Sequence, residues 1–213
     1  MLEEGAIVTN ERKFLIDEIV AVEWEMFSSV NNIGGRSACQ DQQDTFEIMR
    51  RCNLLTWPAA MLRSYRADLY AALEEGRNTM TEKYARMMES TSPEEYAAIA
   101  RYLPPVSEEV LQLVDRAADV LVPWEEELRE KYPFLAARGR GLSVDEGPGS
   151  KTSFETYLRA ELKTYSAETL RAYVAYLEEA AAAGVNGSAS VYQNMVRMYG
   201  YDSLEQASRA MAE

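Results

Sequence analysis

The stretch "NERKFLIDEIVAVEWEMFSSV", residues 10–30, decides the fold class. Its apolar side chains recur at three- and four-residue spacing, at Ile16, Ile19, Val20, Phe27 and Val30. This period predicts an amphipathic α-helix that buries one stripe of side chains. Thr9 or Asn10 is predicted to cap the start of this helix.

The same period extends along most of the chain, and no stretch alternates as a strand would. Further helical segments, some of them directly consecutive, are expected at 44–57, 58–76, 78–90, 92–103, 107–132, 153–165, 166–183 and 188–199, with a short one from 202 or 203. Gly76, Gly184 and Gly200 are predicted to end helices, and Pro123 to kink or divide one. The sequence therefore predicts an all-α fold, a single compact domain over residues 1–213 with eight or nine short helices and no significant β-sheet.

Residues 136–152, "AARGRGLSVDEGPGSKT", form the one long irregular stretch of the sequence. A loop of this length is typical of lids, binding loops or disordered segments, so we expect a flexible loop here. The stretch could instead divide two lobes. One domain is favoured because each half alone would bury little apolar area.

The net charge of −13 sets limits on the partners of the chain. Coating a nucleic acid or docking on an anionic membrane requires a basic surface, so neither is expected. The apolar runs are too short to span a membrane, and the acidic N-terminus "MLEEGAIVTNERKF" lacks the apolar region of a signal peptide. A cytoplasmic location is therefore predicted.

The chain contains no histidine and two cysteines. This composition argues against a histidine-dependent nucleophile, the common zinc sites, haem held by histidine, and the histidine-ligated di-iron bundles. Acid–base chemistry would have to use Glu, Asp, Lys, Tyr or Cys. Any metal would be held by oxygen, with magnesium possible. Otherwise the cofactor is unknown.

Three charged residues fall on apolar stripes. Glu23 lies four residues from both Ile19 and Phe27, Arg50 lies four after Phe46, and Glu161 lies four after Tyr157. An unpaired buried charge costs several kcal/mol, so these side chains should pair or line a cleft. Two interpretations stay open. One is a structural ion network, and the other is a polar pocket in which Glu23 and Glu161 act as acid and base.

The loop "VNNIGGRSACQDQQD", residues 30–44, is polar and rich in glycine. Asn31 and Asn32 are suited to ending the preceding helix, and Arg36 to holding a carboxylate or phosphate. Cys39 would be a nucleophile only if a neighbour such as Arg36 lowered its pKa. The loop matches no phosphate-binding motif, so a plain connection between helices is the alternative. Asp41 and Asp44 would then cap the next helix.

Two helical segments carry Glu–Arg pairs four residues apart. Glu82 and Arg86 are expected on a solvated face, and Glu155 pairs with Arg159 in the same way. Tyr157 lies beside the inward Glu161. We therefore expect the helix from residue 153 to contribute to any site.

Six stretches of the sequence carry a resemblance to a known family. They are "EWEMFSSVNNIGGRSACQD" (23–41), "FEIMRR" (46–51), "MTEKYARMMESTSPEEY" (80–96), "TSFETYLRAEL" (152–162), "TYSAETLRAY" (164–173) and "YGYDSLEQA" (199–207). Together they resemble the bacterial family known as domain of unknown function 4125, over nearly the whole chain. The resemblance implies a small helical cytoplasmic domain that sometimes occurs joined to or near a nucleotidyltransferase-like domain.

The resemblance also favours a shared site. Its residues would be Glu23, Asn31, Asn32, Arg36, Cys39, Gln40, Asp41, Arg50, Glu155 and Glu161. The favoured hypothesis is a domain that binds a small polar or anionic metabolite. One form of this hypothesis is that the domain also transforms the metabolite chemically. Arg36 and Arg50 would hold the ligand, and Glu23, Glu161 or Cys39 would act on it. The alternative is an accessory helical module for a nucleotidyltransferase-like partner, non-catalytic alone. A purely structural or regulatory protein is the third possibility.

Overall fold

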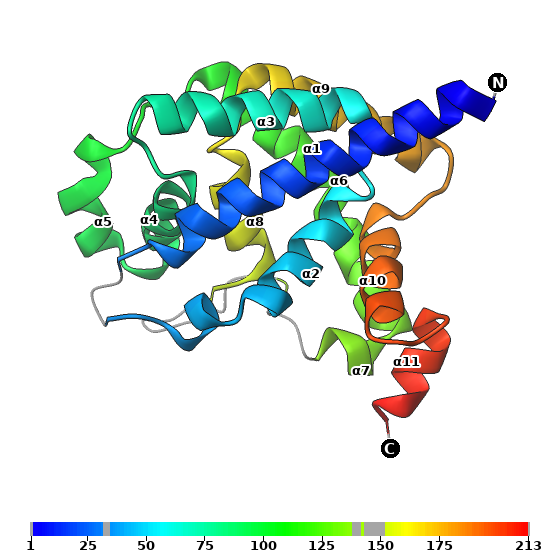
Figure 1. The fold of residues 1–213 in the computed structure, drawn as a ribbon. Helices are drawn as coiled ribbons and strands as arrows, with labels where there is room; N and C mark the ends of the chain where they lie inside the picture. The colour runs from blue at the N-terminus through cyan, green and yellow to red at the C-terminus, as the bar shows by residue number, and fades with distance from the viewer. Residues whose placement is uncertain (1, 32–34, 138–141, 143–151, 213) are drawn as a thin grey trace.

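The computed structural model describes residues 2–31, 35–137, 142 and 152–212, with the backbone alone at 2–9 and 136. Within these ranges the chain forms eleven α-helices, two short 3-10 helices and no strand (Figure 1). The all-α prediction is confirmed, but the predicted count of eight or nine helices is too low. Helices such as α7 (Pro133–Ala136) are too short to show a period in the sequence. The flexible loop predicted at 136–152 lies almost wholly outside the described residues.

The first half of the chain packs around α1, which crosses the front of the molecule in Figure 1. Its helices are α1 (Leu2–Ser28), η1 (Ala38–Asp41), α2 (Gln43–Leu54), α3 (Ala59–Glu74), α4 (Thr79–Thr91), α5 (Pro93–Ile99) and η2 (Ala100–Tyr102). α2, α3 and α4 each contact α1, and α5 packs on α4. The long apolar stripe of α1 thus organises this half.

The second half packs around α6 in the same way. Its helices are α6 (Glu108–Lys131), α7, α8 (Phe154–Leu162), α9 (Ala167–Ala182), α10 (Gly187–Met198) and α11 (Leu204–Ala210). α8, α9 and α10 contact α6, while α11 packs on α7 and α10.

The most extensive contacts between the two halves are those of α3 with α9, α2 with α10, and α4 with α8. A continuous apolar core runs through the junction, with Ile19 and Leu62 from the first half and Val114 and Leu170 from the second. Residues far apart in the sequence therefore meet at this junction.

The predicted starts of three helices and the predicted glycine ends are confirmed. Ser107, Ser153 and Ser166 each accept a hydrogen bond from a backbone N–H in the first turn of the helix they precede. These bonds satisfy donors that a helix start leaves open. The glycines predicted to end helices, Gly76, Gly184 and Gly200, have φ of 69°, 68° and 88°, the left-handed region that favours glycine.

Two predictions about helix boundaries are wrong, and a third is wrong in part. α1 begins at Leu2, so neither Thr9 nor Asn10 caps it. α6 runs through Pro123, so the predicted division is wrong, because packing on several helices outweighs one lost hydrogen bond. The alternative, a kink at Pro123, stays a prediction. Gln42 precedes α2 and accepts no capping bond through its side chain, so neither Asp41 nor Asp44 caps this helix.

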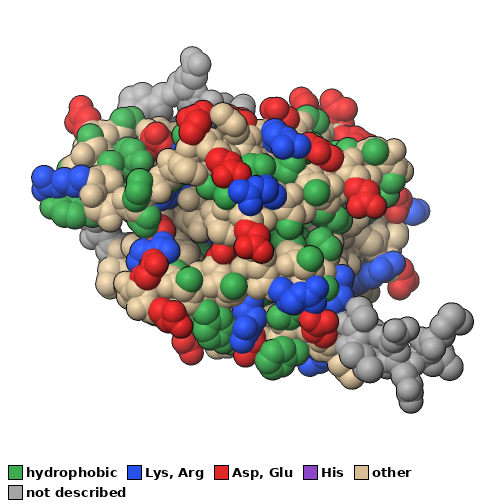
Figure 2. Space-filling model, turned by 90° about the horizontal axis from the view of Figure 1, so that it is seen from above, with side chains coloured by type: hydrophobic (Ala, Val, Ile, Leu, Met, Phe, Trp, Pro, Cys, Tyr) green, Lys and Arg blue, Asp and Glu red, His purple; other side chains and the backbone are tan. Residues whose placement is uncertain are grey.

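Acidic and basic side chains are interspersed over the face shown in Figure 2. Several of them form exposed ion pairs, such as Arg116 with Glu178 and Arg171 with Glu109. Across the described part of the chain, no helix is both long and apolar enough to cross a membrane.

Candidate functional site

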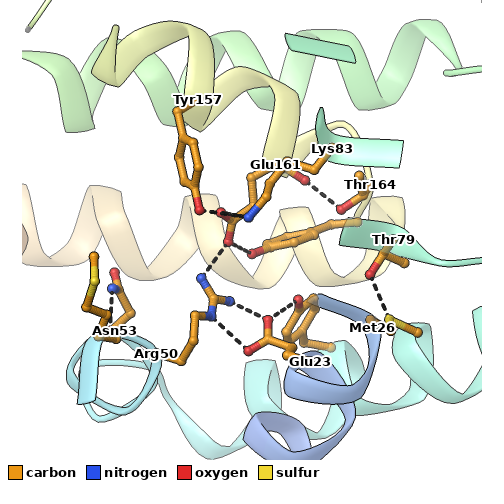
Figure 3. A network of polar contacts seen from close by, with 12 residues as sticks. Glu23, Met26, Arg50, Asn53, Thr79, Lys83, Tyr157, Glu161 and Thr164 are labelled. Carbon is orange, nitrogen blue, oxygen red and sulfur yellow. Dashed lines mark hydrogen bonds and ion pairs between the residues drawn. The ribbon is translucent and has the colours of Figure 1, made fainter. Parts of the chain in front are cut away.

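Arg50 of α2 lies between two carboxylates at the junction of the halves (Figure 3). Its Nε donates to Oε2 of Glu23 on α1 at 2.8 Å, and its Nη1 donates to Oε1 of Glu161 on α8 at 2.9 Å. Glu23 is fully buried, and the Glu161 side chain is 13% exposed. The three charges expected on apolar stripes thus meet in one network.

Four further side chains belong to this network. Tyr65 of α3 donates to Glu23 at 2.6 Å, and Tyr165 donates to Glu161 at 2.9 Å. Lys83 of α4, itself 3% exposed, donates to the Tyr157 hydroxyl at 2.7 Å and lies 3.4 Å from Oε2 of Glu161. Two cations therefore face two carboxylates, each bound by more than one donor.

The pKa values follow from this arrangement. Burial alone would raise the pKa of Glu161, but Arg50 and Lys83 outweigh it and lower this pKa to about 2. Burial likewise opposes the charge on Lys83, yet the oxygens of Tyr157 and Glu161 raise its pKa above the usual value. At neutral pH Glu161 is therefore ionised and Lys83 is protonated.

A cavity of about 520 Å³ opens beside Arg50, Tyr157 and Glu161, between α2, α6, α8, α9 and α10. Its aromatic walls include Trp57, Trp124, Phe154, Tyr157, Tyr173 and Tyr176. The rings of Trp57 and Tyr173 lie 5.5 Å apart, so the wall is an aromatic cluster backed by the ion network.

A second ion pair lines the same cavity. Arg129 donates to Glu125 at 2.9 Å, and Tyr192 lies within 3.5 Å of the same carboxylate oxygen. Burial raises the pKa of Glu125, and it raises that of Tyr192 to about 12. The cavity thus presents polar groups from two clusters and apolar rings around them.

The protein-family model for proteins of unknown function, DUF4125, matches residues 13–209, which include every residue of the network and the cavity. The chain belongs to the DUF4125 family. No curated protein and no solved structure matches the chain.

The site residues predicted for this DUF4125 chain fall into two groups. Arg50, Tyr157 and Glu161 line the cavity, and Glu23 lies behind Arg50. The described residues of the 31–41 segment do not line it. There Arg36 pairs with Asp41 at 2.8 Å.

This segment instead closes the end of α1. Arg36 donates to the carbonyls of Ser28 and Gln40, both at 2.7 Å, and Gln40 donates to those of Phe27 at 3.1 Å and Val30 at 2.8 Å. The last carbonyls of a helix have no partner within it, so these bonds satisfy them.

The other predicted residues also lie away from the cavity. Asn31 and Cys39 are exposed, and Glu155 pairs with Arg159 at 2.7 Å, as expected from their spacing. Asn32 lies outside the described residues. Both cysteines are free thiols, and burial raises the pKa of Cys52.

The sequence analysis missed Lys83, Tyr65, Tyr165 and the Glu125–Arg129 pair. The helical spacing of the sequence could have indicated two of these residues, Lys83 and Glu125. Lys83 lies four residues before Met87, and Glu125 lies three before Leu128, so both share buried stripes. The expectation of a solvated Glu82–Arg86 face is wrong. Both side chains are buried, and Glu82 pairs with Arg77 at 2.8 Å.

A metal site finds no support in these groups. Among the residues that the structure describes, no three Asp, Glu or Cys side chains converge as metal ligands would. The carboxylates that line the cavity, Glu125 and Glu161, are bound to cations instead.

We expect Gly187→Ala to destabilise this DUF4125 chain by about 1–3 kcal/mol. A Cβ at residue 187 would lie 2.6 Å from Cζ3 of Trp124, which forms part of the cavity wall. At an unobstructed helical position the same change would stabilise the protein. Urea denaturation measures the sign directly, and a gain in stability would contradict this close packing.

Proposed function

We propose that this chain binds a small polar metabolite in the cavity between α2, α6, α8, α9 and α10. One observation carries the proposal: a buried ion network with balanced charges opens onto an aromatic-lined cavity. Buried ion networks rarely add net stability compared with apolar packing, so a binding role offers a reason for this one. The proposal keeps the cytoplasmic location expected from the sequence.

The size and lining of the cavity support a small organic ligand. Binding sites for such ligands usually have volumes of about 300–1,000 Å³, apolar walls and a few converging polar groups. The cavity has a volume of about 520 Å³, and the ion network and the Glu125–Arg129 pair supply polar groups. A flat ring would stack on Trp57 or Tyr173, while polar substituents reach the charged groups.

The charge balance narrows the class of ligand. Arg50 and Arg129, the cations of the cavity wall, are each bound to a carboxylate. An incoming anion would have to compete with those carboxylates. The arrangement therefore favours a polar ligand that is uncharged or zwitterionic over an anionic one.

The low pKa of Glu161 restricts the part that this residue could take in any chemical step. A carboxyl group with a pKa of about 2 carries almost no proton at neutral pH, so it is a poor general acid. In this proposal Glu161 orients the ligand and holds Arg50 and Lys83 in place.

A thermal-denaturation screen tests the proposal, with nucleosides, aromatic amino acids and related heterocycles as ligands. A ligand at a hundred times its dissociation constant adds about 2.7 kcal/mol, which raises the melting temperature by roughly 5–10 °C. Val191→Trp should abolish this shift, because Val191 lines the cavity and a larger side chain would fill it.

Val185→Trp is the matched control, because Val185 is 47% exposed and lies outside the cavity. A ligand that shifts the wild type and Val191→Trp equally would contradict binding at this site. If the screen finds no ligand, the alternative of an accessory module for a nucleotidyltransferase-like partner becomes the next proposal, and co-purification tests it.

A further inference from the structure

Arg86 on α4 is a buried guanidinium without a carboxylate partner. The residue is 7% exposed, and among the described residues its side chain makes one hydrogen bond, from Nη2 to the carbonyl of Pro104 at 2.7 Å. Its Nε is buried and has no partner there. Glu82, one turn earlier on the same helix, is bound to Arg77.

Such an arrangement is costly in the free protein. Arginine is almost never fully buried unless it is paired, because desolvating an unpaired charge costs several kcal/mol. Burial lowers the pKa of Arg86, and the more distant carboxylates Glu82 and Glu89 only partly offset it. An anion would supply the missing charge and acceptors.

A cavity of about 470 Å³ lies directly beside Arg86. It is formed by α4, α5, η2, the segment 103–106, the start of α6 and Lys163 at the end of α8. Arg86, Arg101 and Lys163 line it together with a single carboxylate, Glu89, which lies 3.0 Å from Lys163. No described residue lines both this cavity and the aromatic one.

We propose that this second cavity binds a phosphate group, with Arg86 as its buried anchor and Lys163 and Arg101 nearer its mouth. Three cations against one carboxylate favour an anion with two charges, although the whole chain has a net charge of −13. Phosphate also offers several acceptor oxygens to the unused donors of a guanidinium. The group could come from inorganic phosphate or from a phosphomonoester, which share this chemistry.

Thermal denaturation of the full chain tests this proposal, with inorganic phosphate or ribose 5-phosphate added against sodium chloride of equal ionic strength. The wild type should show a saturable rise of roughly 5 °C or more at a hundred times the dissociation constant. Arg86→Met should abolish that rise. The same variant should melt above the wild type without phosphate, since it removes an uncompensated buried charge.

Arg116→Met is the matched control, because Arg116 is exposed and bound to Glu178. It should leave the phosphate response unchanged. A stronger response to the phosphomonoester than to inorganic phosphate would identify a phosphorylated metabolite, and equal responses would identify the free ion as sufficient.

The proposal would be overturned if neither phosphate compound raised the melting temperature saturably, or if Arg86→Met kept the full rise. It would also be overturned if succinate, a dicarboxylate tested for comparison, raised the melting temperature and the phosphate compounds did not. If Arg86→Met does not fold, calorimetric titration of Lys163→Gln replaces it. We expect at least a fivefold weaker affinity for phosphate in that variant, and an unchanged affinity would also overturn the proposal.

Discussion

Arg50→Met should destabilise the protein by about 3–5 kcal/mol, the range for removing one partner of a buried ion pair. The change leaves Glu23 fully buried without its guanidinium and takes from Glu161 the stronger of its two cationic contacts. The midpoint of thermal unfolding should fall by roughly 10 °C. Urea denaturation followed by circular dichroism gives the free energy.

Arg171→Met is the matched control for this prediction. Arg171 is bound to Glu109, but both side chains are more than half exposed, so its loss should cost less than about 1 kcal/mol. Similar losses for the two variants would contradict the view that burial makes the Arg50 network sensitive.

A fourfold variant separates a structural role of the network from a binding role. Changing Glu23 and Glu161 to Gln, and Arg50 and Lys83 to Met, removes all four charges together and leaves none uncompensated. Replacing a complete buried ion network by well-packed apolar residues is often neutral or stabilising. Gln at residues 23 and 161 keeps an acceptor oxygen for the hydroxyls of Tyr65 and Tyr165. A stable fourfold variant that no longer binds ligand would indicate that the charges are retained for binding.

The parts of the fold that the sequence predicts are those that depend on neighbours along the chain. A helix start such as the one at Ser153 and a helix end such as Gly184 depend on only a few adjacent residues, and the sequence predicts both positions. The inward direction of Glu23, Arg50 and Glu161 follows from helical period alone. That these three side chains meet cannot be predicted in this way, because periodicity does not say which helix faces which. Arg50 and Glu161, for example, are 111 residues apart in the sequence.

For the 31–41 segment the sequence predicted a ligand site that the structure does not place at the cavity. Arg36 and Gln40 are polar loop residues suited to a ligand, but in the structure their donors meet carbonyls at the end of α1. A helix carbonyl and a ligand oxygen accept the same hydrogen bonds, so residue type alone could not distinguish the two roles. Lys83 was missed for a related reason, because a lysine on a mixed helix face normally points into solvent.

Acid should weaken the protein through Glu161. The pKa of this group is about 2 in the folded protein against a usual value near 4.5, so folding favours its ionised form. The resulting stability is fully present above about pH 5.5 and is lost as the pH falls from about 5 to about 2. A shift of this size corresponds to about 3 kcal/mol.

The free energy of unfolding of the wild type and Glu161→Gln, measured from pH 7 to pH 2, checks this prediction. The variant should be less stable at pH 7, and the difference should shrink by about 3 kcal/mol at the acid end. A difference that stays constant with pH would contradict the lowered pKa.

The comparison at each pH matters because other groups also titrate. Burial raises the pKa of Glu125, so that group contributes in the opposite direction and loses its contribution as the pH rises. Protonation also takes the net charge from −13 through zero near the pI of 4.6 to a positive value, so self-repulsion falls and then rises. Both effects are common to the wild type and Glu161→Gln, so the difference between them isolates the Arg50–Lys83–Glu161 network that joins the two halves of the fold.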